Sequence, residues 1–388
     1  MVGTATNMLI ELISPFLREK MAEAKENWGE DSQEYQAIAR QYLSDTSEAI
    51  DRAEERTRHY QSEVHIQFEN VPVYGIERLY KNTVLLQPTT VCAAHCRWCL
   101  RGRYPIRTLS HDEIEHAARY IGSAGVRDNL KEVLITGGDP LMSLSLLRHT
   151  IDMLQRHAPN IRIIRIGTRV PFQDPRRIND EMIEMFSNFN GMRFELGVNV
   201  NHPVEFWPES IVSLRMLQGV GFRVYNQHPL LRGVNDNLTT LVQLYSLMRD
   251  HDIEAHYLFH AIPMKGTAHH RTSLAVGSSL ANALSSCGIF SGRGKPRFAV
   301  LSDIGKIVMY QDAIVDRRTD SNEVLIRSGY RLEDRRRWNP GWIPPDTMRL
   351  ADDGTMMTWY LDAQHEEDIA TNSVTGDVEV EGNLSGHL

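Results

Sequence analysis

Short apolar segments alternate with amphipathic helical segments along most of this 388-residue chain. Apolar runs typical of buried strands lie at residues 83–87, 132–136, 161–166, 193–198, 222–225, 253–259 and 297–301. Helical patterns lie between them at residues 144–156, 180–186, 209–218 and 238–249, and Ser110 with Glu113 forms a capping box that should begin another helix. Such alternation predicts an α/β fold in which parallel strands form a full or partial barrel.

The two ends of the chain differ from this central region. Residues 13–64 are dense in Glu, Lys, Arg, Gln and Ala, which is typical of surface helices. We therefore expect residues 1–74 to form an N-terminal helical extension, solvated or facing another copy in a homo-oligomer, and residues 75–310 to form the barrel. A charged stretch ends the alternation, so residues 311–365 are predicted to be a small C-terminal extension and residues 366–388 a flexible tail.

The composition is that of a globular protein, with 41% hydrophobic and 24% charged residues. No apolar run approaches the length of about eighteen residues that a membrane span needs, and the N-terminus lacks the pattern of a signal peptide. We therefore expect a cytoplasmic protein without a membrane partner. The formal charge of −8 argues against a nucleic-acid partner and favours a small-molecule substrate.

Three of the four cysteines follow the first apolar run with the spacing Cys92-x3-Cys96-x2-Cys99. Thiolates are soft ligands that suit zinc or an iron–sulfur cluster. A structural zinc site needs a fourth protein ligand, and neither His95 nor the distant Cys287 has the paired spacing of common zinc motifs. Three cysteines would leave one iron of a [4Fe-4S] cluster open to another ligand, and we prefer this interpretation.

The cysteine spacing, its place after the first strand and Trp98 before the third cysteine resemble the radical S-adenosylmethionine (SAM) superfamily. The resemblance implies a partial (βα)6 TIM-like barrel in which the open iron binds SAM and donates one electron to cleave it. The product would be a 5′-deoxyadenosyl radical, and the electron would come from a flavodoxin- or ferredoxin-type donor. The other motifs also lie at strand ends, where barrels of this type form their active sites.

Four segments resemble one branch of that superfamily, the lysine 2,3-aminomutase-like enzymes: ITGGDPL, IRIGTRVP, NVNHPVE and YNQHPLLRGVND. Taken alone, a Gly-Gly pair is equally a tight turn that lets backbone approach a ligand, and a lone Arg or His is more often a surface or core residue. The resemblance implies contacts with SAM or substrate. The candidate cofactor-binding residues are therefore Gly137, Gly138, Asp139, Arg169, His202 and Gln227.

The stretch SGRGKPRFAVLSDIGKI resembles the segment that carries the pyridoxal 5′-phosphate (PLP) lysine of the family. It implies that Lys306 is the Schiff-base lysine, with Lys295 as a rival in the same segment. A lysine must lose its proton to attack an aldehyde, and burial would lower its pKa in that direction. Arg101 matches the arginine that binds the substrate carboxylate, although an arginine beside a cluster could equally offset thiolate charge.

The segment ERLYKNTVL departs from the family pattern, because Leu79 and Thr83 stand where arginines bind the PLP phosphate. Arg78 and Lys81 are the nearby basic residues that could replace them.

Ile262 and Leu301 stand where the lysine enzyme has two aspartates that hold the distal ammonium of its substrate, and Asp303 could restore one acidic contact. The sequence thus predicts a radical SAM and PLP-dependent amino-acid 2,3-aminomutase, an isomerase that moves an α-amino group to the β-carbon of an amino acid other than lysine. The alternatives are a PLP-independent dehydratase, epimerase or other hydrogen-abstracting enzyme on a biosynthetic intermediate, and a non-catalytic zinc protein.

Overall fold

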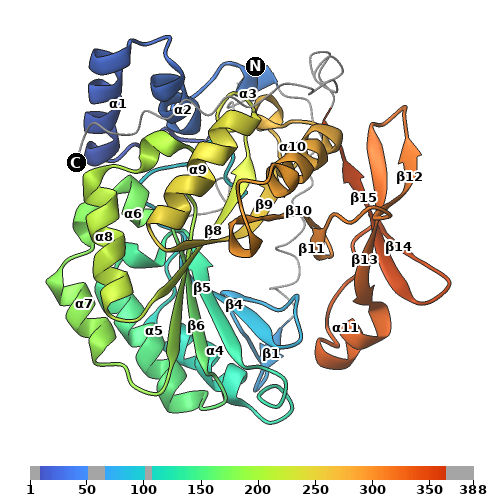
Figure 1. Cartoon of the computed structure of the whole chain (residues 1–388). Helices are drawn as coiled ribbons and strands as arrows, with labels where there is room; N and C mark the ends of the chain where they lie inside the picture. Colours follow the sequence, from blue (N-terminus) through green and yellow to red (C-terminus); the bar gives the residue numbers. More distant parts are fainter. Residues whose placement is uncertain (1–8, 51–65, 101–106, 364–388) are drawn as a thin grey trace, which may run out of the picture.

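A curled nine-stranded sheet forms the centre of the protein in the computed structural model, which describes residues 9–50, 66–100 and 107–363 (Figure 1). Its strand order is β11-β10-β9-β8-β7-β6-β5-β4-β3. Strands β4 to β10 run parallel, whereas β3 and β11 pair antiparallel at the two edges. The strands are β3 (Ile76–Glu77), β4 (Thr83–Thr89), β5 (Glu132–Gly137), β6 (Ile163–Thr168), β7 (Arg193–Val198), β8 (Arg223–Leu230), β9 (Ile253–His260), β10 (Arg297–Ser302) and β11 (Gly305–Val308).

Helices cover the convex face of this sheet (Figure 1). They are α4 (His111–Gly122), α5 (Leu144–His157), α6 (Val170–Gln173), α7 (Asp180–Ser187), α8 (Pro208–Gly219), α9 (Leu238–Asp250) and α10 (Leu274–Ser286). Alternate strand residues such as Val84, Leu86 and Ile135 join these helices in one buried core. The predicted capping box is present, because Ser110 and Glu113 each accept the other's main-chain N–H.

The predicted partial α/β barrel is confirmed, but the count of six βα units is not. The sheet of the described residues has parallel strands from β4 through β10 and an antiparallel strand at each edge. Short 3-10 helices shape the loops beyond the strand ends: η2 (Pro140–Met142), η3 (Pro175–Arg177), η4 (Pro203–Glu205), η5 (Ala268–His270) and η6 (Gly292–Gly294).

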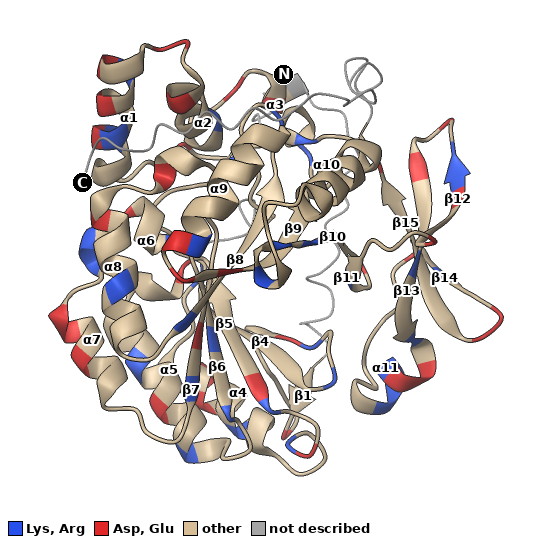
Figure 2. Cartoon of the chain, viewed as in Figure 1, with Lys and Arg blue, Asp and Glu red and all other residues tan. Residues whose placement is uncertain are grey.

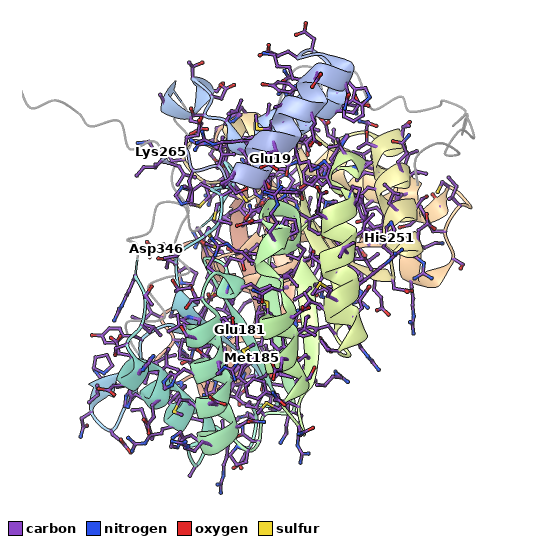
Figure 3. The ribbon with its side chains drawn as sticks, turned by 90° about the vertical axis from the view of Figure 1, so that its left-hand side faces the viewer. Glu19, Glu181, Met185, His251, Lys265 and Asp346 are labelled. Carbon is purple, nitrogen blue, oxygen red and sulfur yellow. The ribbon has the colours of Figure 1, made fainter. Side chains whose placement is uncertain are left out.

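The N-terminal helices α1 (Pro15–Trp28), α2 (Gln33–Tyr42) and α3 (Ser47–Ile50) pack at one end of the barrel. Figure 3 shows Glu19 of α1 at the same end as Lys265, which follows β9. Phe16, Leu17 and Tyr42 are fully buried in a cluster that includes Trp207 of the barrel. The apolar face of these helices is thus covered by the same chain, while many residues on their other face are exposed.

A second, antiparallel sheet follows the barrel, although the sequence pattern did not indicate strands there. Among the described residues its order is β12 (Ile314–Arg318), β13 (Glu323–Arg331), β15 (Thr355–Leu361) and β14 (Met348–Leu350), with α11 (Leu332–Trp338) after β13. A small hairpin of β1 (Gln67–Phe68) and β2 (Val71–Pro72) precedes the barrel. We refer to residues 314–361 as the C-terminal sheet.

Basic and acidic residues are mixed along the helices and the C-terminal sheet in the view of Figure 2. Within the described parts of the chain, no helix combines the length and the apolar character that crossing a membrane requires.

Candidate active site

The cysteine loop begins directly after β4, at the carboxyl end of the parallel strands. The side chains of Cys92, Cys96 and Cys99 are half-buried and none forms a disulfide. The main-chain N–H of Cys99 donates to the carbonyl of Cys96 at 3.0 Å, which turns the loop between those two thiols. Among the residues that the structure describes, no three Cys, His, Asp or Glu side chains are arranged as ligands of one metal ion. The loop nevertheless brings three soft donors to the end of the barrel where such folds hold their active sites.

Gly137 and Gly138 at the end of β5 support this loop. The N–H of Gly138 donates to the carbonyl of Thr89 at 2.7 Å, and the N–H of Asp139 donates to that of Val91 at 2.8 Å. A Cβ atom would lie 2.3 Å from the Thr89 oxygen if placed on Gly137, and 2.3 Å from the Val91 oxygen if placed on Gly138. Glycine is required here because the backbone of the cysteine loop lies directly against the strand end.

Asp139 connects the end of β5 to the end of β6. Its buried carboxylate accepts hydrogen bonds from the hydroxyl of Thr168 at 2.8 Å and from the main-chain N–H groups of Leu141, Arg169 and Val170 at 3.0, 2.7 and 3.2 Å. Burial raises the pKa of Asp139 to about 6, although the hydrogen bonds from these donors act to lower it. The carboxylate thus fixes the main chain at Arg169.

Arg169 joins that strand end to the cysteine loop. Its Nη1 donates to Cys96 Sγ at 3.0 Å, and Gln173, one turn further along α6, donates to the same sulfur at 3.3 Å. Its Nη2 donates to Glu205 at 2.7 Å and to Gln41 of α2 at 3.0 Å. The sequence predicted Arg169 but missed Gln41, Gln173 and Glu205. Only Gln173 had a local signal, since it lies four residues after Arg169 in a helical segment.

His202 and Gln227 also lie at this end of the barrel. His202 is buried, its Nδ1 accepts the N–H of Val204 at 3.1 Å, and burial lowers its pKa to about 4, so the ring is neutral near pH 7. Gln227 Oε1 and Asn199 Oδ1, near the ends of β8 and β7, are buried and have no hydrogen-bond partner among the described residues. Buried amide oxygens without partners are costly in a protein alone, so these two fit a polar ligand.

Lys306 lies on β11, opposite Leu301 of β10. Phe298 on β10 faces α10, since a Cβ on Gly277 of that helix would lie 2.3 Å from its ring. Leu301 and Lys306 therefore lie on the opposite, concave face. The Lys306 Nζ is 5.4 Å from the ring centres of both Tyr257 and Phe259 on β9. The structure thus directs the predicted lysine into the barrel, whereas its rival Lys295 is exposed.

Arg78 is not brought together with Lys306. Its buried guanidinium donates to the hydroxyl of Tyr120 on α4 at 3.3 Å and lies 5.5 Å from the ring centre of Trp338, which puts it on the convex face. Its Nε and Nη2 have no partner among the described residues. Lys81 is exposed. Arg101 lies outside the described residues.

Asp303 is held in the turn between β10 and β11, where its carboxylate accepts the hydroxyl of Thr347 at 2.7 Å. It is thus tied to the C-terminal sheet. Ile262, beyond β9, and Leu301 are both half-buried apolar side chains.

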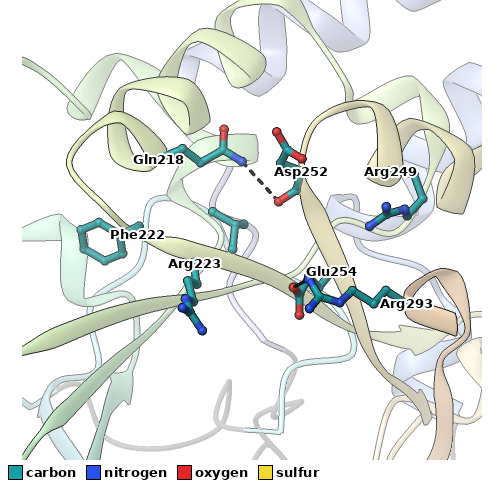
Figure 4. Close-up of a pocket in the computed structure, with 8 residues that line it drawn as sticks. Gln218, Phe222, Arg223, Arg249, Asp252, Glu254 and Arg293 are labelled. Carbon is teal, nitrogen blue, oxygen red and sulfur yellow. Dashed lines mark hydrogen bonds and ion pairs between the residues drawn. The ribbon is translucent and has the colours of Figure 1, made fainter.

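A cavity of about 600 Å³ lies at the opposite end of the barrel (Figure 4). Its lining includes Arg223 at the start of β8, Glu254 at the start of β9 and Arg293, whose guanidinium pairs with Glu254 at 2.9 Å. Because it opens at the amino ends of the strands, it is separate from the cysteine loop.

Residues 86–244 match the family model of the radical SAM superfamily. This segment of the chain is similar to that superfamily. A putative L-lysine 2,3-aminomutase of Aquifex aeolicus is 33% identical over 237 residues, which cover 60% of this chain and 62% of that protein. The L-lysine 2,3-aminomutase of Fusobacterium nucleatum is 31% identical over 235 residues, which cover 60% of this chain and 54% of that protein. The chain is therefore similar to lysine 2,3-aminomutases over about 60% of its length, and it spans less than two thirds of the length of either relative.

A solved structure of a radical SAM methyltransferase from Sphaerobacter thermophilus is 21% identical, with a TM-score of 0.43, and covers 58% of this chain and 68% of its own.

Similarity to the radical SAM superfamily implies a [4Fe-4S] cluster and SAM. The residues present fit both cofactors. Cys92, Cys96 and Cys99 supply the thiolates that a cluster needs while leaving one iron without a protein ligand. The unpartnered oxygens of Gln227 and Asn199 lie near the ends of neighbouring parallel strands and suit a polar cofactor such as SAM.

Proposed function

We propose that this radical SAM enzyme is an amino-acid 2,3-aminomutase that acts on an amino acid other than lysine, with PLP held by Lys306. The relatives that are named L-lysine 2,3-aminomutase support the reaction class. The observation that carries the proposal is the position of Lys306, whose ammonium group lies against two aromatic rings on the concave face of the barrel. PLP, when bound, would supply a conjugated system that accepts an adjacent radical.

Each group of residues in this chain would then have a separate role that depends on its location. Cys92, Cys96 and Cys99 would hold the cluster at the strand ends, with Gln227 and His202 beside SAM. Lys306 would approach from the edge hairpin. Arg101, which follows the third cysteine in the sequence, is proposed to hold the substrate carboxylate.

The substrate side chain is proposed to be apolar or neutral. Leu301 lies opposite Lys306 on the concave face, and both Leu301 and Ile262 lack a charge that could pair with a distal ammonium. Asp303 is held toward the C-terminal sheet, where its carboxylate accepts the hydroxyl of Thr347. A lysine substrate would leave a desolvated cation without a counter-ion, which is unfavourable.

The placement of Arg78 favours a second candidate function. The guanidinium of Arg78 bonds to Tyr120 on α4 and Lys81 is exposed, so the observed contacts of these two residues do not support them as phosphate anchors for a PLP on Lys306. The second candidate is therefore a PLP-independent radical SAM enzyme, such as a dehydratase or epimerase, in which Lys306 would contact the substrate itself.

One anaerobic experiment separates the two candidates. The reconstituted enzyme is incubated with SAM, dithionite and the twenty amino acids, with and without PLP, and 5′-deoxyadenosine and β-amino acids are measured. The aminomutase predicts a β-amino acid that requires PLP and is lost in Lys306→Ala but kept in Lys295→Ala. If SAM cleavage responds to no amino acid and borohydride traps no PLP on Lys306, the aminomutase is excluded.

A further inference from the structure

Lys306 lies on an edge strand, where its main-chain groups are not used by the sheet. In the antiparallel pairing of β11 with β10, Lys306 stands opposite Leu301. On an edge strand, every second residue directs its N–H and carbonyl away from the sheet. Such groups normally face water and leave an edge strand free to shift. The direction of the Lys306 side chain would then be poorly fixed.

Two tyrosine hydroxyls form hydrogen bonds with the main-chain N–H and carbonyl of Lys306. The N–H of Lys306 donates to the hydroxyl of Tyr80 at 3.3 Å, and the hydroxyl of Tyr330 donates to the carbonyl of Lys306 at 2.5 Å. The rings of Tyr80 and Tyr330 pack edge to face with their centres 6.3 Å apart. Tyr80 follows β3, at the far edge of the sheet, and Tyr330 belongs to β13. The lysine is therefore held between the other barrel edge and the C-terminal sheet.

Tyr330 is itself fixed by contacts that bind the same hairpin. Its ring lies against Gly305, where φ is +123° and a Cβ would lie 3.2 Å from the ring. Arg335 of α11 lies 5.4 Å from the Tyr330 ring, is almost fully buried, and donates to the carbonyl of Ile304 at 2.9 Å. Three successive residues of the hairpin, Ile304 to Lys306, are thus bound by the C-terminal sheet and its helix.

We propose that Tyr80 and Tyr330 are positioning residues that fix the main chain of Lys306 and thereby direct its amine into the barrel, so that the C-terminal sheet is a functional part of the active site. This inference rests on the proposed function, in which the Lys306 amine holds the cofactor. It explains why the hairpin needs glycine at position 305 and why a tyrosine from outside the barrel contacts a lysine within it.

The test measures the reactivity of the Lys306 amine in the full chain without added PLP. Acetylation by acetic anhydride is followed by mass spectrometry across a range of pH for the wild type, Tyr80→Phe and Tyr330→Phe. Each variant keeps the ring and removes one hydroxyl. Tyr245→Phe is the matched control, since its buried hydroxyl bonds to His228 on the convex face. The exposed Lys295 gives an internal reference for the reagent.

We expect Lys306 to be acetylated on the order of fivefold faster in Tyr80→Phe and Tyr330→Phe, the factor that corresponds to the loss of about one hydrogen bond. Lys295 should react at the same rate in every variant, and Tyr245→Phe should behave as wild type. If Lys306 reacts at the wild-type rate and with the wild-type pH profile in both variants, the positioning role is excluded.

Borohydride trapping of PLP on the wild-type enzyme is the separate test of the proposed function. Faster acetylation in the two variants, with no PLP trapped on wild-type Lys306, would support the positioning role and exclude the PLP-dependent function.

Discussion

The guanidinium of Arg169 and the thiol of Cys96 are in direct contact, with Nη1 3.0 Å from Sγ. Gln173 supplies a second donor to the same sulfur. Hydrogen bonds to a sulfur ligand raise the reduction potential of an iron–sulfur cluster, because they stabilise the more negative, reduced state. The two donors to Cys96 are therefore expected to tune the cluster.

Replacing Gln173 by Leu should lower the reduction potential of the reconstituted cluster. Gln173 is chosen because Arg169 also pairs with Glu205 at 2.7 Å, and removing Arg169 would leave this buried carboxylate without its cationic partner. The loss of one hydrogen bond worth about 1 kcal/mol corresponds to a shift on the order of 40 mV for a one-electron couple. Redox titration followed by electron paramagnetic resonance measures it. A potential equal to that of the wild type would contradict the tuning role.

Replacing Gly138 by Ala should destabilise the cysteine loop. The new methyl group would lie 2.3 Å from the Val91 carbonyl oxygen, so the loop must move away from β5. We expect a loss of about 3 kcal/mol or more in the free energy of unfolding and a reduced iron content after reconstitution. Gly219→Ala is the control, since a Cβ there meets no atom within 4 Å. Equal stability and iron content in the two variants would rule out this role of Gly138.

Replacing Gln41 by Leu should weaken the attachment of α2 to the active site. The Gln41 amide oxygen accepts hydrogen bonds from Arg169 and Asn201, at 3.0 and 2.7 Å, and both bonds would be lost, although Arg169 would keep its bond to Glu205. The expected cost is about 1–3 kcal/mol in the free energy of unfolding, measured with urea. Gln36→Leu on the same helix is the control, because Gln36 bonds only to the carbonyl of Glu30. The prediction fails if both variants unfold at the same urea concentration.

Asp139 should make stability depend on pH. Its pKa in the folded protein is raised to about 6, above its usual value. A raised pKa contributes stability below the unfolded-state value of about 4, and this contribution is lost as the pH rises through about 6. Asparagine does not titrate. Between about pH 4 and pH 6, the free energy of unfolding of the wild type should therefore fall by up to about 3 kcal/mol relative to that of Asp139→Asn. Urea unfolding at several pH values measures the difference, and parallel profiles for the two proteins would contradict it.

The features that the sequence predicted well are local. The capping box at Ser110 spans four residues, and the loop of Cys92, Cys96 and Cys99 spans eight. Apolar strands and amphipathic helices can also be recognised in short stretches of sequence, because their periodicity is set by backbone geometry. The C-terminal sheet escaped prediction because the charged residues of β12 hide its strand pattern and because its strands are defined by their pairing.

The sequence by itself thus determined the barrel, the cysteine loop and the candidate lysine. Only the tertiary structure decided which face each residue occupies and what it touches. Arg78 is two residues before Tyr80, yet it lies on the convex face while Tyr80 contacts Lys306, 226 residues away in sequence. Gln41 reaches Arg169 across 128 residues in the same way. Contacts of this kind arise when the sheet curls and brings distant segments together, so no local pattern in the sequence encodes them.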